Sequence, residues 1–574
     1  MGMTELKRAA LAQDVPGFVD ALVSLSQTDV YWGRQLDAVR DAVKLEELPF
    51  RVPAAVALSE RLPAVPGEDA KCLLDYVIDY LLMEEGRRTE LPDALAILGV
   101  AAKYWEFTTY VAMEELGATV LKAGGTLAPE VVAVMRRTAT IEGHRSLKAF
   151  ATGLQQPLLN QGDAWADRAL ADLSAWGDDW HDLVAHAANV TWDALPPEWA
   201  APTPEWEEAA HRLLVKLGPG RVREVVLGWL ALADAPRAVS LRDRTGYGRE
   251  QRGDLYNSMV LRRLVWLLGL VPPDGQLTRS LADAAEANLR KVPGGPRNRP
   301  VAEGAVHALS RHTDTEAGSE ALAQLVRLAA RVTHKPTAQQ IGAAIDSRAE
   351  ALQATREQVL DFAVLSFGLT EVGRRVQRFG EDPGDTGILR IEGAGADIEW
   401  RNGAGMTVGS PPTAVKQGFP EQLQQFRESA KELGRTLPAL TAALRRQLGA
   451  RQSWRYGTWR ALVLDHVVAG ALARGLLWQV DGRLCGYADG ELRPVDGTAM
   501  PLPAGDGASV RLWDPASSPP DEVFAAREWL ARHGIIQPFP QVPVDWRISA
   551  SGGEGEAVDV EQAAGAGEDE VQRS

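Results

Sequence analysis

The segment whose side chains are best suited to bind a ligand is a run of arginines and aromatic residues near residue 450. Between Leu433 and Leu464 the sequence contains no aspartate or glutamate. A guanidinium group binds phosphate oxygens through forked hydrogen bonds, and an aromatic face stacks on a base, so this combination is typical of sites for single-stranded nucleic acid, a nucleotide or a phosphorylated partner. The candidate anion-binding residues are Arg451, Arg455, Arg460, Trp454 and Trp459.

A structural interpretation of the same segment competes with the anion-binding one. The chain contains 50 arginines and 11 lysines, so clusters of arginine are common in it. Aromatic residues at this spacing are also compatible with a helix that packs against a neighbouring β segment. We therefore favour structural or intramolecular pairing and keep an anion site as the alternative. A second basic run, which acidic residues interrupt, is a weaker signal of the same kind and contains Arg237, Arg242, Arg244, Arg249 and Arg252.

Acid–base and nucleophilic chemistry have few candidates. His466 follows Asp465, and Asp514 is a carboxylate that would orient an imidazole, so His466 and Asp514 are the weak catalytic candidates. Adjacent residues on a helix point about 100° apart, which argues against a working Asp465–His466 pair. Cys485 lies in a strand-like run, where we expect a buried apolar thiol.

Metal and cofactor motifs are absent from the sequence. A zinc-binding pair on a helix needs histidines four apart, whereas the pairs here are five apart, which predicts surface histidines and no metal site. The pairs are His181 with His186 and His307 with His312. Gly393-Ala394-Gly395 lacks the third glycine of a dinucleotide fingerprint, and we expect no bound cofactor.

From about Thr4 to Ala354 the apolar spacing predicts helices almost throughout. One helix shows the pattern, because Thr203 is suited to cap it, Pro204 to begin it and Gly218 to end it. Further helices are predicted at 165–176, 180–190, 257–270, 278–291, 301–310, 316–332 and 337–354. The predicted fold class is therefore mainly α. Because the helical pairs show no strict sequence period, we expect an irregular HEAT-like array.

The pattern changes near Phe379 to an α+β C-terminal module. Tight-turn residues separate short alternating runs, which predicts a three-stranded meander and a second β segment with hairpins. The predicted strands are 388–391, 397–400, 406–408, 476–480, 484–488, 492–495 and 509–513, and the predicted helices are 421–448, 459–477 and 521–533.

We divide the chain into four regions. An N-terminal helical region (1–160) precedes the array (161–378), the α+β module (379–550) and an acidic tail (551–574). The tail holds seven acidic residues and one arginine among glycine and alanine, which predicts disorder. A functional alternative is that the tail folds back on the cluster from Arg435 to Arg460, where its carboxylates would compete with an acidic ligand.

Composition narrows the class of protein. The 574 residues are 45% hydrophobic with a formal charge of −16, which argues against a protein that coats nucleic acid or anionic membranes. Two cysteines more than 400 positions apart exclude a disulfide scaffold. The longest apolar runs are far shorter than the ~18 residues needed to span a bilayer, and no signal peptide is evident, so we expect a soluble, cytoplasmic protein.

A series of short motifs follows one another from about Asp163 to Trp546. Early motifs mark helical pairs and later ones lie in the C-terminal module: Pro204-Glu205-Trp206, Leu264-Val265-Trp266, Phe367-Gly368-Leu369, Asp465-His466, Leu476-Leu477-Trp478, Val510 to Pro515, and Gln537 to Gln541. In this order and spacing the motifs resemble the MolR-like bacterial family, large helical proteins that are homologues of a molybdate regulator and carry a domain of unknown function.

The chain departs from the pattern of that family at several polar positions. It has His466-Val467 where the family usually has His-Pro, and Asp514-Pro515 where a second His-Pro is usual. Val544 and Trp546 stand where the family has Arg and Tyr. If those positions form a site in relatives, that site is altered in this chain, and an activity of the family does not transfer directly.

The leading functional hypothesis is a non-enzymatic helical scaffold or regulator that binds protein partners. The resemblance implies partners such as a MoxR-type AAA+ ATPase and a von Willebrand A-domain protein, in a stress or defence system. The alternative is a nucleic-acid or nucleotide-binding regulator that uses Arg451 to Arg460. The second alternative is an enzyme of unknown reaction in the C-terminal module.

Overall fold

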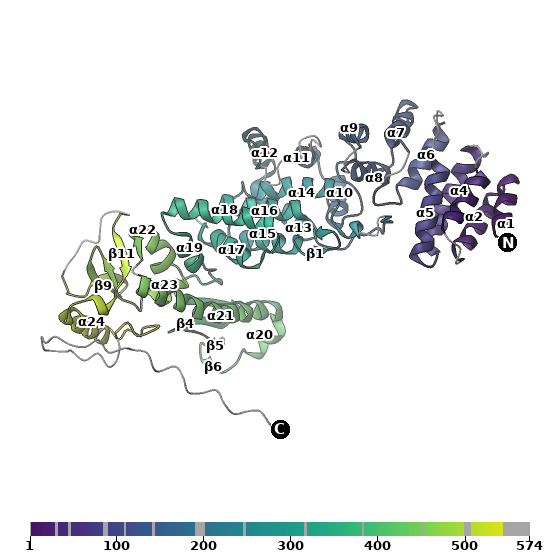
Figure 1. Ribbon diagram of the computed structural model, residues 1–574. Coiled ribbons are helices and arrows are strands. Elements are labelled where there is room, and N and C mark those ends of the chain that lie inside the picture. Colours follow the sequence, from purple (N-terminus) through teal and green to yellow (C-terminus); the bar gives the residue numbers. More distant parts are fainter. Residues whose placement is uncertain are drawn as a thin grey trace, which may run out of the picture. The chain divides into compact units, whose positions relative to one another are not determined.

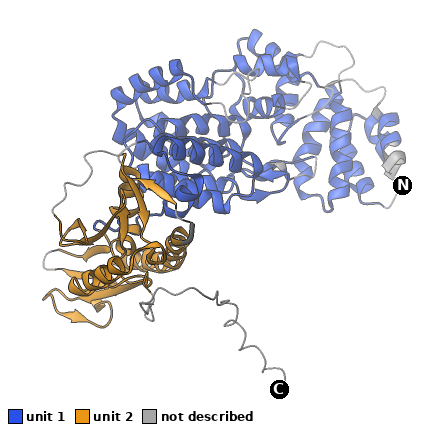
Figure 2. Cartoon of the chain, turned by 60° about the vertical axis from the view of Figure 1, so that its left-hand side comes forward, with its two compact units in different colours: residues 1–371, 466–468 blue, residues 372–465, 469–574 orange. Residues whose placement is uncertain are grey.

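The computed structural model describes residues 2–28, 32–43, 48–83, 90–107, 111–140, 144–189, 201–244, 248–314, 318–381, 384–450, 452–498 and 507–542. Two compact units make up the chain: unit 1 comprises residues 1–371 and 466–468, and unit 2 comprises residues 372–465 and 469–574 (Figure 2). Helix predominates in the described residues, as the sequence predicts, and the sheets lie in the C-terminal part of the chain. The predicted acidic tail lies outside the described residues.

The N-terminal helices of unit 1 pack around a core of their own, which runs from Leu6 to Ala151 (Figure 1). Helices α4 and α5 pack against each other, and so do α6 and α7, because their apolar residues face one another. The helices are α1 (Gly2–Leu11), α2 (Val15–Ser26), α3 (Trp32–Val43), α4 (Leu48–Arg61), α5 (Glu68–Leu82), α6 (Leu91–Ala101), α7 (Met113–Lys122), α8 (Pro129–Ala139) and α9 (Arg145–Gly153).

The remaining helices of unit 1 form the predicted array of helical pairs, with a second core from Leu158 to Ala363. They are α10 (Ala164–Ala175), α11 (Asp178–Ala188), α12 (Pro204–Leu217), α13 (Pro219–Leu230), α14 (Leu255–Leu268), α15 (Gly275–Asn288), α16 (Arg299–His312), α17 (Gly318–Arg331), α18 (Lys335–Leu352) and α19 (Arg356–Phe362), with a small hairpin of β1 (Lys291–Val292) and β2 (Gly295–Pro296) between α15 and α16. The predicted cap is confirmed, because the Thr203 hydroxyl accepts the N–H of Trp206 at 3.2 Å. Gly218 ends α12 with a positive φ of 86°.

Unit 2 begins with a sheet of four strands where the sequence predicted three. The order is β3-β4-β5-β6, all antiparallel, with β3 (Arg374–Phe379), β4 (Asp385–Glu392), β5 (Gly395–Arg401) and β6 (Thr407–Val408). Strand β3 was missed because Phe379 is its only buried residue, so its sequence shows little alternation of apolar and polar residues. Helices α20 (Thr413–Gly418) and α21 (Pro420–Ala450) follow, and Phe426 of α21 packs edge-on against Trp400 of β5.

The second sheet of unit 2 has five strands in the order β10-β9-β8-β11-β7. Its strands are β7 (Ser453–Arg455), β8 (Trp478–Val480), β9 (Arg483–Ala488), β10 (Glu491–Pro494) and β11 (Ser509–Leu512), and α24 (Pro520–Arg532) follows them. Both predicted hairpin turns are confirmed: Asp481-Gly482 and Asp489-Gly490 have positive φ at both positions, as a two-residue hairpin turn with right-handed strand twist requires. Strand β7 lies within the arginine-rich segment, where no strand was predicted.

The prediction of one helix over 459–477 is wrong. The structure has α22 (Tyr456–Trp459), a five-residue π-helical turn η4 (Arg460–Leu464) and a short α23 (Ala469–Ala473). The π turn closes with a bond of 2.8 Å from the N–H of Asp465 to the carbonyl of Arg460. Gly470 then approaches the Leu464 carbonyl so closely that a Cβ at that position would collide with it. The apolar spacing alone does not reveal this interruption.

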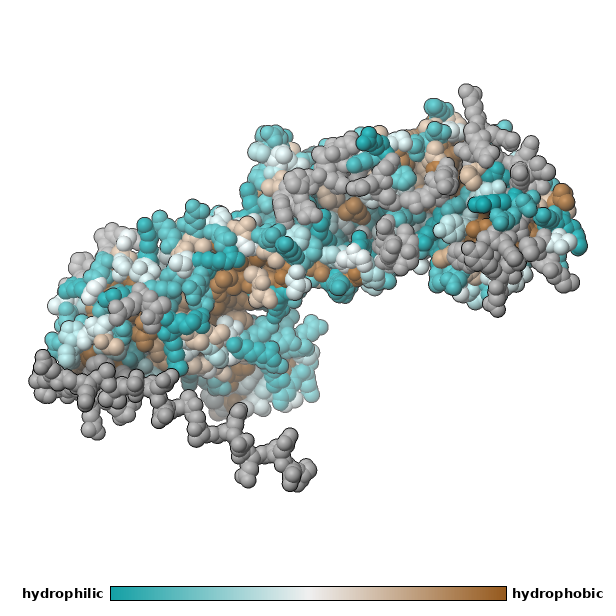
Figure 3. Space-filling view, in the orientation of Figure 1, coloured by the Kyte–Doolittle hydropathy of each residue, from teal (hydrophilic) through white to brown (hydrophobic). Residues whose placement is uncertain are grey.

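The visible surface is mainly polar. Figure 3 shows hydrophilic residues over most of the face turned to the viewer, with hydrophobic residues mostly in recesses between them. Among the described residues, no helix combines the length and the apolar character that crossing a bilayer demands.

Candidate functional site

The loop that follows α13 is held against the N-terminal helices by main-chain hydrogen bonds. Tyr104 and Arg242 form an isolated parallel β-bridge. The N–H of Arg242 donates to the Lys103 carbonyl at 3.1 Å, and the N–H of Trp105 donates to the Arg242 carbonyl at 2.9 Å. The main chain of residue 242 therefore contributes directly to holding this loop in place.

Arginine side chains of the same loop pair with carboxylates that are distant in the sequence. Arg242 lies 2.7 Å from Glu68 and 3.1 Å from Asp75. Burial raises the pKa of Asp75, although Arg244 and Arg242 act to lower it. The pairs are Arg242 with Glu68 and Asp75, Arg244 with Asp79, and Arg237 with Asp163. The second basic run of the sequence thus docks the loop; the side chain of its Arg249 lies outside the described part of the chain.

Beneath the loop, a buried polar network joins α8 to α14. Arg137 of α8 donates to Asp254 at 3.2 Å and to the Trp105 carbonyl at 2.5 Å. Asp254 accepts two bonds of 3.1 Å from the Asn160 amide and caps α14 by accepting the N–H of Tyr256 at 3.0 Å. Burial lowers the pKa of Arg137, and the Asp254 carboxylate opposes that shift. Each buried charge has a partner, so the network stabilises the connection between the two cores of unit 1.

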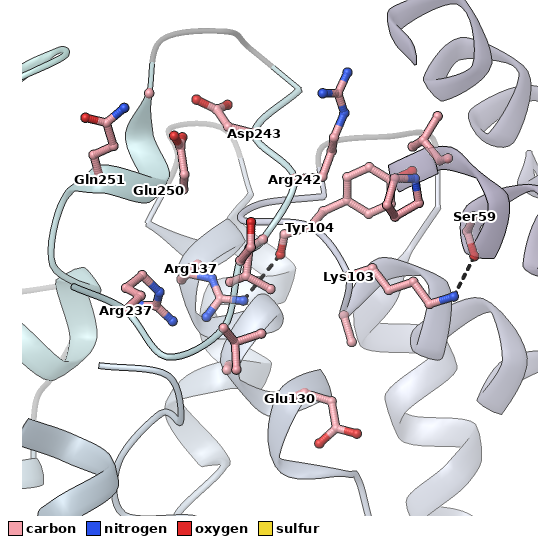
Figure 4. Close-up of a pocket in the computed structure, with 18 of the residues that line it drawn as sticks. Ser59, Lys103, Tyr104, Glu130, Arg137, Arg237, Arg242, Asp243, Glu250 and Gln251 are labelled. Atoms are coloured by element: carbon pink, nitrogen blue, oxygen red, sulfur yellow. Dashed lines mark hydrogen bonds between the residues drawn. The ribbon is translucent and has the colours of Figure 1, made fainter. Parts of the chain in front are cut away.

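Between the docked loop and the N-terminal helices lies a cleft of about 960 Å³. Figure 4 shows Lys103, which donates to Ser59 at 2.9 Å, on one side of it and Glu250 and Gln251 on the other. Val239 of the loop lines the cleft and is 53% exposed. The charged lining carries both signs: Glu68, Lys71, Lys103, Glu130, Arg137, Arg237, Arg242, Asp243 and Glu250. This combination of apolar contact and mixed charge suits a segment of polypeptide.

One carboxylate in the cleft has an unused acceptor. Oε2 of Glu250 is buried and makes no hydrogen bond within the structure. A buried carboxylate oxygen without a donor is destabilising, and a donor brought by a ligand would satisfy it. Glu250, which lines the cleft, is thus a carboxylate whose hydrogen-bonding capacity the fold leaves incomplete.

The aromatic residues of the predicted anion segment lie inside unit 2. Trp454 is buried and donates through Nε1 to Gln447 at 3.0 Å. Trp459 is fully buried, and its ring meets Trp478 edge to face with centroids 5.0 Å apart. Stacking with bases needs exposed ring faces, whereas these rings pack in the core.

The arginines of that segment lie at the surface where they are described. Arg455 is exposed on β7. Arg460 lies 2.6 Å from Asp465, and Arg474 approaches the same carboxylate at 3.6 Å. Arg451 lies outside the described residues. The segment thus combines a buried aromatic side with a paired, half-exposed arginine.

The weak catalytic candidates bond to backbone groups. Nδ1 of His466 accepts the N–H of Val468 at 3.2 Å, the ring also bonds to the backbone of Val364, and burial lowers the pKa of His466 to about 4. Asp514 accepts the N–H of Ala516 at 3.0 Å and caps the short helix η5 (Pro515–Ser517). His466 belongs to unit 1 and Asp514 to unit 2. Burial also raises the pKa of the Cys485 thiol to about 11, which disfavours the reactive thiolate.

The expectation of four surface histidines is wrong for His312. Its side chain is 1% exposed, and Nε2 lies 2.9 Å from the Leu268 carbonyl. Burial lowers the pKa of His307, on the same helix, to about 4. Helix α16 packs against α14, α15 and α17, so more than one of its faces is buried. Within the ranges described above, no three His, Cys, Asp or Glu side chains gather as a metal site would require.

Sequence reasoning did not predict the cleft as one site. Its lining extends from Ser59 to Pro293 and comes from helices and loops that are far apart in the chain. The local signal that points to it is the basic run from Arg237 to Arg252, which the interrupting acids made less conspicuous.

Comparison with known proteins places one domain. Residues 405–553, which belong to unit 2 except for residues 466–468, match a domain of unknown function, DUF4132. The early motifs of the MolR-like resemblance precede residue 405 and lie outside this match. No curated protein matches the chain, and no solved structure matches it.

Proposed function

We propose that this chain is a non-enzymatic helical scaffold that binds a protein partner in the cleft of unit 1. The observation that carries the proposal is the cleft, in which exposed Val239 lies among charged residues of both signs. Arrays of helical pairs present extended surfaces, and an apolar residue in a pocket contributes a large part of the binding energy of an interface.

The lining defines the chemistry of the partner segment. An apolar side chain of the partner contacts Val239 and Leu241, and a basic side chain lies near the carboxylate of Glu250. Lys71 and Lys103 on the opposite wall attract an acidic residue further along the segment. The partner segment therefore carries an apolar residue flanked by charges of both signs.

The finer part of the proposal rests on the family resemblance. The DUF4132 match in unit 2 is compatible with a MolR-like protein. That resemblance implies a partner of the MoxR-type AAA+ ATPase or von Willebrand A-domain class, in a cytoplasmic stress or defence system. The identity of the protein captured in the experiment below tests this class of partner independently of the binding cleft.

Affinity capture of the full chain from native lysate, followed by mass spectrometry, tests the proposal. We expect Val239→Asp to reduce the recovered partner by about tenfold or more, because it places a charge at the apolar contact. Val215→Asp on α12 is the matched control, because Val215 is 79% exposed and lies outside the cleft lining. Equal recovery by both variants, or no stoichiometric partner for the unsubstituted chain, would overturn the proposal.

A further inference from the structure

Unit 1 holds a second recess, of about 710 Å³, whose charged lining residues are mostly basic, although two of them, Arg137 and Arg299, pair with the carboxylates of Asp254 and Glu303 outside the lining. It shares one lining residue, Arg137, with the cleft described above. Glu106 is the only carboxylate in its lining. Its basic lining residues are Arg137, Arg252, Arg297, Arg299 and His334. A basic recess in a chain of net charge −16 is a local feature that overall composition conceals.

The arginines of the recess are held in place by neighbouring backbone. Arg297 donates through Nη1 to the Gln251 carbonyl at 3.0 Å, and its Nε is buried without a hydrogen-bond partner. Arg252 lies across the turn of the β1–β2 hairpin, where a Cβ at Gly294 would collide with its guanidinium group. Positioned side chains lose little freedom when they bind a ligand, which favours binding.

Asn298 is the feature that points to a ligand. It lines the recess at the N-cap position of α16, is 2% exposed, and neither amide atom of its side chain has a hydrogen-bond partner. An asparagine at this position ordinarily caps its helix, but this one makes no capping bond. Buried amides without partners are rare in folded proteins, and a bound ligand is one reason for their presence.

The Asn298 amide packs closely against Gly253. A Cβ at Gly253 would lie 2.9 Å from Nδ2 of Asn298 and 3.1 Å from the Ser258 hydroxyl. Gly253 has no positive φ that would itself call for glycine. Residue 253 therefore has to be small for the amide to keep its position.

We infer that this recess binds the phosphoryl group of a small molecule, with Nδ2 of Asn298 facing the anion among the surrounding arginines. The start of α16 adds a partial positive charge, which favours phosphate, although Pro300 in its first turn has no N–H to donate. Arginine is well suited to phosphate oxygens, because its forked donors match their geometry. A volume of about 710 Å³ also accommodates an organic phosphate of nucleotide size.

Calorimetric titration of the full chain in about 50 mM salt tests the inference, because attraction between exposed charges is only partly screened there. The probes are inorganic phosphate, pyrophosphate, AMP and ATP. We expect pyrophosphate and ATP to bind more tightly than phosphate because they carry more charge. Tighter binding of ATP than of pyrophosphate identifies a nucleotide, whereas equal binding identifies an inorganic or other phosphoryl compound.

Variants locate the binding. Asn298→Asp keeps the size of the side chain and places a negative charge beside the anion, so we expect Kd to rise by about tenfold or more. Arg299→Gln removes one positive charge, and Gly253→Ala displaces the Asn298 amide; both are expected to weaken binding. Arg212→Gln, on an exposed face of α12, is the matched control and is expected to leave Kd within about twofold.

Circular dichroism melting shows which variants fold. If Asn298→Asp does not fold, Arg299→Gln decides the test. The inference is overturned if none of the four probes binds at up to about 10 mM, a concentration that covers weak millimolar sites. It is also overturned if the folded recess variants bind as tightly as Arg212→Gln. Neither result depends on Val239, so failure of this inference is distinguishable from failure of the proposed partner cleft.

Discussion

The two arginine-rich segments of this chain are used differently. In residues 237–252 of unit 1, arginines pair with carboxylates that lie up to 174 positions away in the sequence, as Arg242 does with Glu68. In residues 451–460 of unit 2, the aromatic rings pack in the core, and Arg460 pairs with Asp465, five positions away. The segment without acidic neighbours in the sequence looked the better anion site, yet the basic recess is formed partly by the interrupted segment, through Arg252.

The difference shows that sequence distance is a poor guide to the electrostatic partner of an arginine. Some arginines, such as Arg460, pair with a carboxylate close by in the sequence, whereas Arg242 pairs with carboxylates that the fold brings from a distant helix. Breaking a buried pair, such as Arg137 with Asp254, also costs more than breaking an exposed pair, because the remaining charge is buried without its partner.

Removing Arg137 is expected to produce the largest effect. Arg137→Met keeps most of the apolar volume but leaves Asp254 buried without its cation, so the free energy of unfolding of unit 1 should fall by about 3 to 5 kcal/mol. Urea unfolding followed by tryptophan fluorescence and circular dichroism measures it. The matched control is Arg212→Met on α12, whose exposed pair with Glu208 is worth less than about 1 kcal/mol. A loss for Arg137→Met no larger than the control would show that burial adds nothing to the pair.

Acid is expected to destabilise unit 1 through His466. This residue follows the arginine-rich segment of unit 2 in the sequence, but in the structure it belongs to unit 1. Its folded-state pKa of about 4 lies below the ordinary value of 6.5, so the folded state favours the neutral ring. The stabilisation is complete above about pH 6.5 and is lost as the pH falls towards 4, by up to about 3 kcal/mol.

Denaturant unfolding between pH 7 and pH 4 measures this dependence. His466→Gln should flatten the fall in stability over that window, because the amide does not titrate there. His211→Gln, at an exposed position on α12, should leave the slope unchanged. An unaltered slope in His466→Gln would assign the acid sensitivity to other groups.

The ion pairs of the two arginine-rich segments should contribute differently to the free energy of unfolding. Arg244 is mostly buried and bonds to Asp79 and to the Asp75 carbonyl, so Arg244→Ala should cost about 1 to 3 kcal/mol. Arg460 and its partner Asp465 are more exposed, so Arg460→Ala should cost less than about 1 kcal/mol. Hydrogen exchange should become faster around residue 242 in the first variant only. Equal costs would remove the distinction between the segments.

The smallest effect is expected from the acidic tail. Deleting residues 551–574, which lie outside the described part of the chain, should move the thermal midpoint by no more than about one degree, because the tail has too few apolar residues to pack. A fall of several degrees would contradict the predicted disorder. Tighter pyrophosphate binding after deletion would instead favour the tail as a competitor for an anion site.

Most helices and hairpins were predictable because their signals are local. Thr203 and Pro204 specify a helix start through bonds within one turn. Asp481-Gly482 specifies a hairpin turn through its backbone preferences. Strand β3 and the π turn at 460–464 were missed because both depend on packing against other elements, which apolar spacing does not encode.

The sequence by itself determined the helical array, the change to an α+β module and the positions of the tight turns, because each depends on residues within a few positions of one another. Only the tertiary structure decided where the charges act. Arg137 from α8, Arg252 from the loop, and Arg297 and Arg299 at the start of α16 line one recess although they span more than 160 positions. The amide of Asn298 has no hydrogen-bond partner there, and no local sequence pattern predicts that outcome.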